Sequence, residues 1–183
     1  MLTMKDIVRE GHPALRQKSV EVSVPFSEED KKTAKELLEF VKNSQDPEIA
    51  NKYNLRPGIG LAAPQIGISK RIFAFHVTDE SGKLYSYALL NPKIISHSVQ
   101  MTYLDGGEGC LSVDREVPGF VPRYAKLTVK GYTPDGSEVE LKLKGLPGIC
   151  FQHELDHLDG IMFYDRINEK QPFEPPANSV VFR

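Results

Sequence analysis

The sequence predicts an α+β domain in which antiparallel strands surround a central helix. Two observations support this prediction. Short runs rich in β-branched and aromatic residues, separated by turn residues, recur between Arg71 and Lys144 and are typical of adjacent antiparallel strands. Segments with the apolar spacing of a helix lie before and after this region. The chain has 183 residues, so residues 1–183 are expected to form a single domain.

The first helix is predicted to begin after Ser27 and to end near Asn43. Ser27 is a favourable N-cap residue, and the acidic Asp30 follows three residues later, as in a capping box. Apolar residues then recur at helical spacing at Ala34, Leu37, Leu38 and Val41. Asp46-Pro47 is expected to start a loop or a short extra turn that continues to Pro57.

The strands are preceded by a glycine-bearing apolar stretch, residues 58–67, which is expected to be a loop with a short extended part. Arg71–Val77 and Leu84–Leu90 are predicted to be two strands of a hairpin. Asn91-Pro92 is expected to break the second of these strands. Residues 93–101 are then expected to form a third strand.

A second hairpin and a second helix follow. Tyr124–Tyr132 and Glu138–Lys144 are predicted to pair as a hairpin around a Pro-Asp-Gly turn. The second helix is expected from Ile149 to Leu158, with Gly160 as its C-terminal cap. Near the C-terminus, residues 180–182 are expected to add a short edge strand.

The composition excludes several kinds of partner. The chain has 23 basic and 25 acidic residues and a net charge of -2, which is not the signature of a DNA-binding protein. No apolar run is long enough to cross a membrane, and residues 1–13 mix charged and apolar residues instead of forming the apolar core of a signal peptide. These features favour a cytoplasmic protein that binds neither DNA nor a membrane.

The most informative chemical pattern is His153-Glu154-Leu155-Asp156-His157 on the second predicted helix. Residues four apart lie on one helix face, so His153 and His157 can bind one cation. Glu154 follows the first histidine and can reach a metal-bound water as general base. Two histidines leave such a site incomplete, because a catalytic centre of this kind usually takes three protein ligands and one water.

The third ligand decides the enzyme class. One group of zinc peptidases places a histidine three residues after the glycine that corresponds to Gly160, where this chain has Phe163. Another group uses a downstream carboxylate, and Glu169 and Glu174 are available, although they lie in a proline-rich tail. Cys110, which follows two closely spaced glycines, offers instead a thiolate that would complete a Cys-His-His set.

A further segment, Gly58-Ile59-Gly60-Leu61-Ala62-Ala63-Pro64-Gln65, carries two glycines at alternate positions, which suits an extended backbone that a substrate can pair with. It is not a dinucleotide-binding fingerprint, because position 63 is alanine where the third glycine would stand. Gln65 ends this apolar stretch. Its amide fits equally a donor toward a developing oxyanion and a partner of nearby loop backbone.

Three segments, Gly58–Gln65, Glu108–Ser112 and Gln152–His157, resemble the three signature motifs of the peptide deformylase family in residue type, order and approximate separation. The resemblance covers nearly the whole chain, from the N-terminal region through Phe163. It implies the α+β deformylase fold, with its central helix carrying the HExxH motif. The long segment from Asn43 to Pro57 and the expected C-terminal strand resemble the class found in Gram-positive bacteria.

This resemblance implies a hydrolase of protein biosynthesis that removes the formyl group from the N-terminal formyl-methionine of new polypeptides. It implies three metal ligands: Cys110, His153 and His157. The metal in this family is generally Fe²⁺, although Zn²⁺, Ni²⁺ or Co²⁺ can occupy the site. The metal-bound water would attack the formyl carbon with Glu154 as general base and later general acid. The metal, the Leu111 backbone N–H and the Gln65 amide would hold the oxyanion.

Substrate binding would combine a backbone clamp with an apolar pocket. The candidates for pairing with the substrate backbone are Gly58, Ile59 and Gly60. The candidates for the methionine pocket, which fit equally well as ordinary core residues, are Leu104, Leu146 and Ile149. Nothing in the sequence demands more than a monomer, and ribosome contact stays open. A non-catalytic relative with a structural metal is the remaining alternative, although such a protein would not need Glu154 or Gln65.

Overall fold

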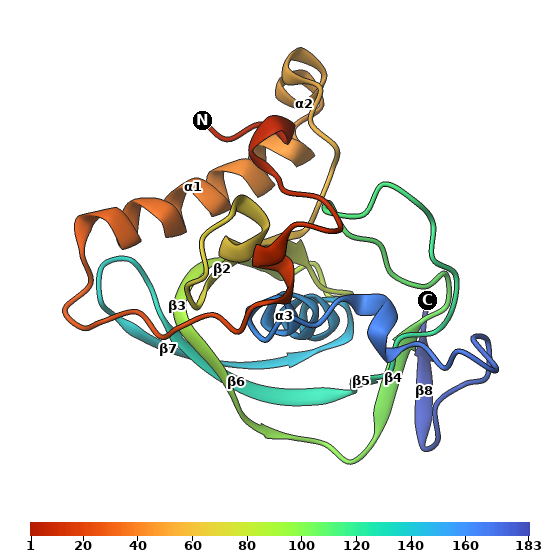
Figure 1. Ribbon diagram of the computed structural model, residues 1–183. Coiled ribbons are helices and arrows are strands. Elements are labelled where there is room, and N and C mark those ends of the chain that lie inside the picture. Colours follow the sequence, from red (N-terminus) through yellow and green to blue (C-terminus); the bar gives the residue numbers. More distant parts are fainter.

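The computed structural model describes residues 1–183 and confirms the predicted α+β fold (Figure 1). Its strands are β1 Gly60–Ala62, β2 Ile72–Thr78, β3 Leu84–His97, β4 Met101–Leu104, β5 Arg123–Tyr124, β6 Lys126–Tyr132, β7 Glu138–Lys144 and β8 Ser179–Phe182. Five of them form an antiparallel sheet in the order β1-β2-β3-β6-β7. The other three form a small sheet in the order β5-β4-β8.

The predicted first helix is confirmed as α1, Glu28–Gln45. The hydroxyl of Ser27 accepts a hydrogen bond from the backbone N–H of Asp30 at 3.1 Å and so caps the helix. After this helix, where a loop or a short extra turn was expected, the chain forms a short second helix, α2, Pro47–Tyr53. The Asp46 carboxylate caps it by accepting from two backbone N–H groups of its first turn, and Pro47 is well suited to the first helical position.

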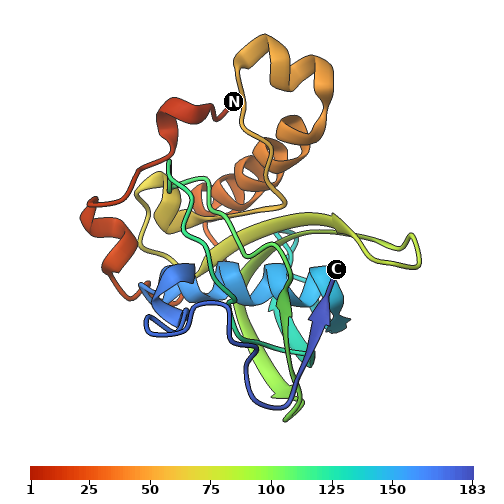
Figure 2. The ribbon, with the colours of Figure 1, turned by 90° about the vertical axis from the view of Figure 1, so that its right-hand side faces the viewer.

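Helices α1 and α3, Gly145–Leu158, cover opposite faces of the main sheet. Figure 2 shows α1 above the yellow-green strands β2 and β3, and α3 below them. Along β2, Ile72 and Ala74 belong to the core under α1, whereas Phe73 and Phe75 belong to the core against α3. Both faces of this part of the sheet are therefore buried, which explains the nearly continuous apolar run of β2.

The prediction that Asn91-Pro92 breaks a strand is wrong. Strand β3 runs through these residues, and its register with β6 shifts between Leu90 and Lys93. Asn91 adopts a positive φ of 52°, and its side chain exchanges two hydrogen bonds with the backbone of Val22, at 2.8 and 3.0 Å. The proline thus lies in a β-bulge, where no ladder hydrogen bond is required of it.

The predicted second hairpin is confirmed as β6 and β7, and the predicted C-terminal strand as β8. Strand β8 pairs with β4 in parallel, which is the one exception to the antiparallel pattern. The cap of α3 is also confirmed, because Gly160 has a φ of 72° and its N–H donates to the carbonyl of His157. None of the helices combines the length and apolar composition of a membrane span.

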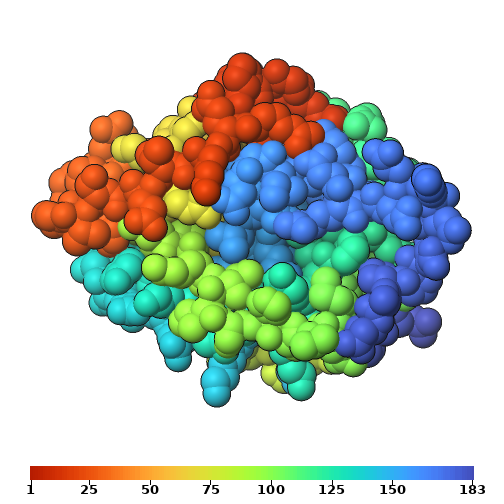
Figure 3. All heavy atoms as spheres, turned by 60° about the horizontal axis from the view of Figure 1, so that its bottom comes forward, coloured from red at the N-terminus to blue at the C-terminus, as the bar shows by residue number.

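The N-terminal segment, residues 1–26, lies across the end of α3. Figure 3 shows its red atoms packed against the blue residues around that helix end. The N–H of Ser19 donates to the carbonyl of Leu158 at 2.7 Å. Farther toward the N-terminus, the N–H of Val8 donates to the carbonyl of Gln65 at 2.8 Å, and that of Glu10 to Ser112 at 3.0 Å. This segment therefore contacts all three regions that carry the sequence motifs.

Candidate metal centre and active site

The structure brings the three predicted ligands, Cys110, His153 and His157, to one place. One potential ligand atom from each lies within 4.8 Å of the other two. The Sγ of Cys110 is 3.4 Å from Nε2 of His157, and the two imidazole rings are 5.1 Å apart. A thiolate and two imidazoles at such spacing fit a divalent transition metal with one position left for water or substrate.

Glu108 orients the first histidine. Its Oε1 lies 2.9 Å from Nδ1 of His153, which leaves Nε2 of that ring to face a metal. The Glu108 side chain is 3% exposed and pairs with Arg123, which is 2% exposed, at 2.8 and 3.0 Å. Burial alone would raise the pKa of Glu108, but Arg123 and His153 outweigh it and lower this pKa to about 2. The carboxylate is thus ionised at neutral pH.

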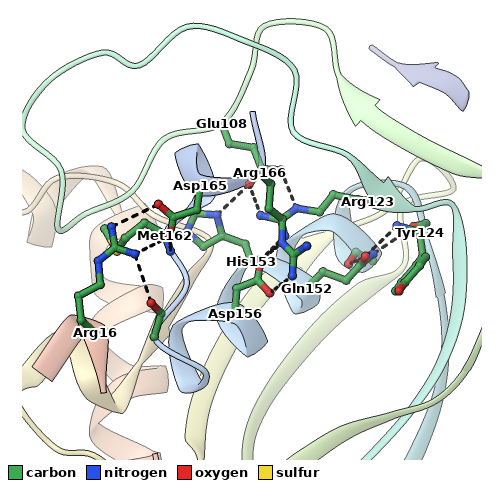
Figure 4. A network of polar contacts seen from close by, with 12 residues as sticks. Arg16, Glu108, Arg123, Tyr124, Gln152, His153, Asp156, Met162, Asp165 and Arg166 are labelled. Atoms are coloured by element: carbon green, nitrogen blue, oxygen red, sulfur yellow. Dashed lines mark hydrogen bonds and ion pairs between the residues drawn. The ribbon is translucent and has the colours of Figure 1, made fainter. Parts of the chain in front are cut away.

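Arg123 also connects this carboxylate to α3 (Figure 4). Its Nη1 donates to Asp156 at 2.6 Å, and Arg166 donates to both oxygens of the same carboxylate. These alternating charges join the loop that contains Cys110 to α3, which carries His153 and His157. Sequence reasoning did not single out Glu108 or Arg123 for this role. The position of Glu108 between two glycines and two residues before Cys110 was the one signal available.

Glu154 lies deep beside the ligands and is 4% exposed. Its Oε1 has no hydrogen-bond partner among the protein atoms. Burial raises the pKa of Glu154 to about 7. A Cβ at Gly60 would lie 2.6 Å from Oε2 of this carboxylate, so only glycine lets β1 approach it so closely. A buried carboxyl oxygen without a partner costs free energy unless a bound group satisfies it.

Gln65 and Leu111 flank the sulfur of Cys110. The Gln65 side chain accepts from the N–H of Ala62 at 3.0 Å, while its Nε2 donates to the Ser112 hydroxyl at 3.1 Å and lies 3.5 Å from the sulfur. The amide therefore bonds to local backbone through its oxygen and turns its nitrogen toward the ligands. The backbone N–H of Leu111 donates to no acceptor in the protein.

These groups line a cavity of about 620 Å³. All six predicted substrate-binding residues lie on its wall: Gly58, Ile59, Gly60, Leu104, Leu146 and Ile149. A Cβ at Gly58 would lie 2.9 Å from the side chain of Leu111, so this glycine lets β1 and the Cys110 loop meet. Four other charged residues on the wall were not predicted as site residues, namely Arg56, Asp114, Arg115 and Glu116.

Comparison with known families and proteins points to one family. The family model described as polypeptide deformylase matches residues 4–173. A protein of Bacillus cereus named peptide deformylase 2 is 68% identical over 179 residues, which cover 98% of this chain and 97% of that protein. A peptide deformylase of Listeria monocytogenes is 58% identical over 182 residues and is covered completely.

Solved structures show the same fold. The peptide deformylase of Thermotoga maritima is 34% identical, with a TM-score of 0.68 over 88% of this chain and 96% of that one. A class I type b peptide deformylase of Acinetobacter baumannii, solved with Met-Ala-Ser bound, is 31% identical. Its TM-score is 0.69 over 88% of this chain and 96% of that one.

Proposed function

The chain belongs to the polypeptide deformylase family, and from that premise we propose that it removes the N-formyl group of formyl-methionine from nascent polypeptides, releasing formate. The observation that carries the proposal is Glu154, a buried carboxylate whose Oε1 is unpartnered beside three converging metal ligands. The tripeptide Met-Ala-Ser in the Acinetobacter relative supports it, because a peptide with a free N-terminal methionine is the kind of product that this hydrolysis leaves.

Cys110, His153 and His157 would hold the metal, which we propose to be Fe²⁺ in the cell, with Zn²⁺, Ni²⁺ or Co²⁺ able to replace it. When bound, such an ion would act as a Lewis acid that lowers the pKa of a coordinated water and polarises a carbonyl. Glu108 supports this centre by fixing the ring of His153, since its carboxylate accepts the Nδ1 proton and leaves Nε2 as the ligand atom.

Glu154 is the proton carrier of the proposed reaction. Its Oε1 accepts the proton of the attacking water and later delivers it to the nitrogen of the leaving methionine. The burial that raises the pKa of this carboxyl group favours its uptake of the proton. Gly60 supports the role by leaving space for the carboxylate against β1.

Two N–H groups are available for the formyl oxygen as negative charge develops on it. The Leu111 backbone N–H is free of protein acceptors, and Nε2 of Gln65 lies 3.5 Å from the sulfur of the neighbouring Cys110. The Ser112 hydroxyl and the Ala62 N–H hold the Gln65 amide in this orientation. Donors fixed before the reaction stabilise the oxyanion without further reorganisation.

The substrate backbone can pair with the edge strand β1, which has β2 as its only neighbour in the sheet. The N–H of Ile59, just before β1, donates to no acceptor in the protein and is available to a peptide carbonyl. Gly58 and Gly60 let Leu111 and Glu154 pack directly against this segment, next to the proposed path of the substrate backbone. The methionine side chain would enter the apolar part of the cavity formed by Leu104, Leu146 and Ile149.

We further propose that the protein acts as a monomer in the cytoplasm, where formylated chains leave the ribosome, with or without direct ribosome contact. A deformylation assay on formyl-Met-Ala-Ser tests the function. The metal-loaded protein should release formate, and Glu154→Ala should lower kcat by about 10²- to 10⁴-fold while it retains its metal. Equal rates for both proteins would contradict the role of Glu154, and no formate from the unaltered protein would reject the function.

A further inference from the structure

The peptide unit between Cys110 and Leu111 has one engaged end and one free end. Its carbonyl accepts two hydrogen bonds, from Nη2 of Arg56 at 2.8 Å and from the N–H of Val113 at 3.0 Å. Its N–H, which belongs to Leu111, donates to no protein acceptor. A peptide unit is planar and trans, so its C=O and N–H point in opposite directions. Whatever fixes the carbonyl therefore also fixes the direction of the free N–H.

Arg56 lies in the connection between α2 and β1, outside all three motif segments. The connection is itself anchored, because Leu55 is buried and its N–H donates to the carbonyl of Ala50 at 2.9 Å. From this position the guanidinium reaches across the cavity wall. Nη2 binds the Cys110 carbonyl, and Nη1 binds Asp114 at 3.1 Å. The planar group is preorganised to make both bonds at once.

We propose that Arg56 is a positioning residue for the deformylation assigned to this site. It aims the Leu111 N–H at the formyl oxygen by holding the carbonyl of the same peptide unit. The inference rests on the proposed function, in which this N–H stabilises the oxyanion. Arg56 acts only through the Cys110–Leu111 peptide, and its role would be felt in the transition state more than in substrate binding.

Two simpler roles for Arg56 make different predictions. In the first, the Val113 N–H alone holds the carbonyl, and loss of Arg56 changes nothing. In the second, Arg56 only tethers the loop through Asp114. Arg9 contacts the same carboxylate, with Nε at 3.0 Å, but donates nothing to the Cys110 carbonyl. Arg9→Ala is therefore the control, since it removes a tether to Asp114, together with the bonds of Arg9 to the carbonyls of Met4 and Ile7, and leaves the peptide contact intact.

The test compares Arg56→Ala, Arg56→Lys and Arg9→Ala in the metal-loaded full chain. Arg56→Ala should lower kcat on formyl-Met-Ala-Ser by about 10- to 100-fold, because a misdirected oxyanion donor loses most of its effect. KM should change by less than about threefold, with metal content unchanged. Arg56→Lys keeps one donor and should recover part of kcat. Arg9→Ala should stay within about twofold of the unaltered protein, as for most exposed ion pairs.

A second measurement does not depend on turnover. In the zinc-loaded protein labelled with ¹⁵N-leucine, Arg56→Ala should shift the Leu111 amide resonance and speed its hydrogen exchange, and Arg9→Ala should do neither. An unchanged Leu111 resonance, or equal kcat losses for Arg56→Ala and Arg9→Ala, would overturn the inference. If the unaltered protein released no formate, the proposed function would fail, while the Leu111 resonance would still decide whether Arg56 controls this peptide.

Discussion

Helix α3 and the loop of residues 105–122 each supply part of the same site, but they are held by different forces. The helix carries Phe151, whose ring packs against the rings of Phe73 and Phe75 at 5.0 and 6.1 Å. The loop contains no helix or strand. Three of its apolar side chains are buried, those of Leu111, Val113 and Val121. Its backbone and charged groups are held by polar contacts from distant segments: Glu108 with Arg123, the Cys110 carbonyl with Arg56, Ser112 with Glu10, and Asp114 with Arg9.

This difference explains how the functional groups of the loop are held in place although the loop has no regular secondary structure. Apolar packing fixes α3 as a body, and the helix geometry then spaces its two histidines. In the loop, each functional group has its own polar partner, so one substitution can disturb one group alone. We therefore expect substitutions in the loop to change activity with little effect on stability. Substitutions in the buried clamp, in which Arg123 binds Glu108 of the loop and Asp156 of α3, should change both.

The largest expected effect comes from the loop. Cys110→Ala should abolish stoichiometric metal binding and lower activity by more than about 100-fold, which is the upper range for residues that only support a ligand. The thermal stability of the Cys110→Ala protein without added metal should change little, because the Cys110 side chain is only partly buried. Cys150→Ala is the matched control and should retain its metal. Full metal content and activity in Cys110→Ala would favour a ligand after His157 and exclude Cys110.

Arg123→Met tests the clamp between the two regions. It leaves Glu108 without its cation in a buried site, which should cost about 3–5 kcal/mol of unfolding free energy. Urea unfolding measures this loss. Arg115→Met is the control: Arg115 lies in the loop and forms a more exposed ion pair with Glu10 of the N-terminal segment, so its loss should lower the unfolding free energy far less. Similar losses for the two variants would show that the buried clamp has no special weight.

The smallest expected effect concerns the contact between the N-terminal segment and the end of α3. Burial would raise the pKa of Asp165, but the hydrogen bonds from Arg16 and the Met162 N–H and the charges of Arg16 and Arg166 together outweigh this and lower the pKa below 3.8. A lowered folded-state pKa means that the pair stabilises the protein above pH 3.8 and that this stability is lost as the pH falls further.

Unfolding free energies of the unaltered protein and Asp165→Asn should therefore differ at pH 7 and converge as the pH falls below the ordinary aspartate value. The difference at pH 7 should be below about 1 kcal/mol, because both side chains are partly exposed to solvent. A difference that grows on acidification would contradict the sign of the shift. Such a result would show that the Arg16–Asp165 pair does not stabilise the contact between the N-terminal segment and the end of α3.

The same contrast separates what sequence could predict from what it could not. Signals within one helical turn or one hairpin were read correctly, such as the Ser27 cap and the spacing of His153 and His157. Asn91-Pro92 was misread, because the bulge depends on a partner, Val22, that is 69 residues away. The extent of α2 was missed for a local reason, because Asp46 was not recognised as the N-cap residue of a helix.

The three motif segments could be recognised from the sequence because each contains its own local pattern. The residues expected to bind substrate lie together on the wall of the cavity. Arg123 and Arg56 have no such pattern. They matter through hydrogen bonds to Glu108 and to the Cys110 carbonyl, and those partners are 15 and 54 residues away. Nothing in the spacing of single residues reports such a contact, which forms only when the loop folds back on the sheet and α3.

The N-terminal segment has a consequence for how the protein is made. It is synthesised first, yet Val8, Glu10 and Ser19 bond to Gln65, Ser112 and Leu158, the last of which is near the C-terminal end of the chain. The contact of Ser19 can form only after α3 has been synthesised, and that of Glu10 only after the Cys110 loop. The candidate metal centre is completed equally late, because His153 and His157 lie in α3, and an unfinished copy of this chain would lack two of the three proposed ligands.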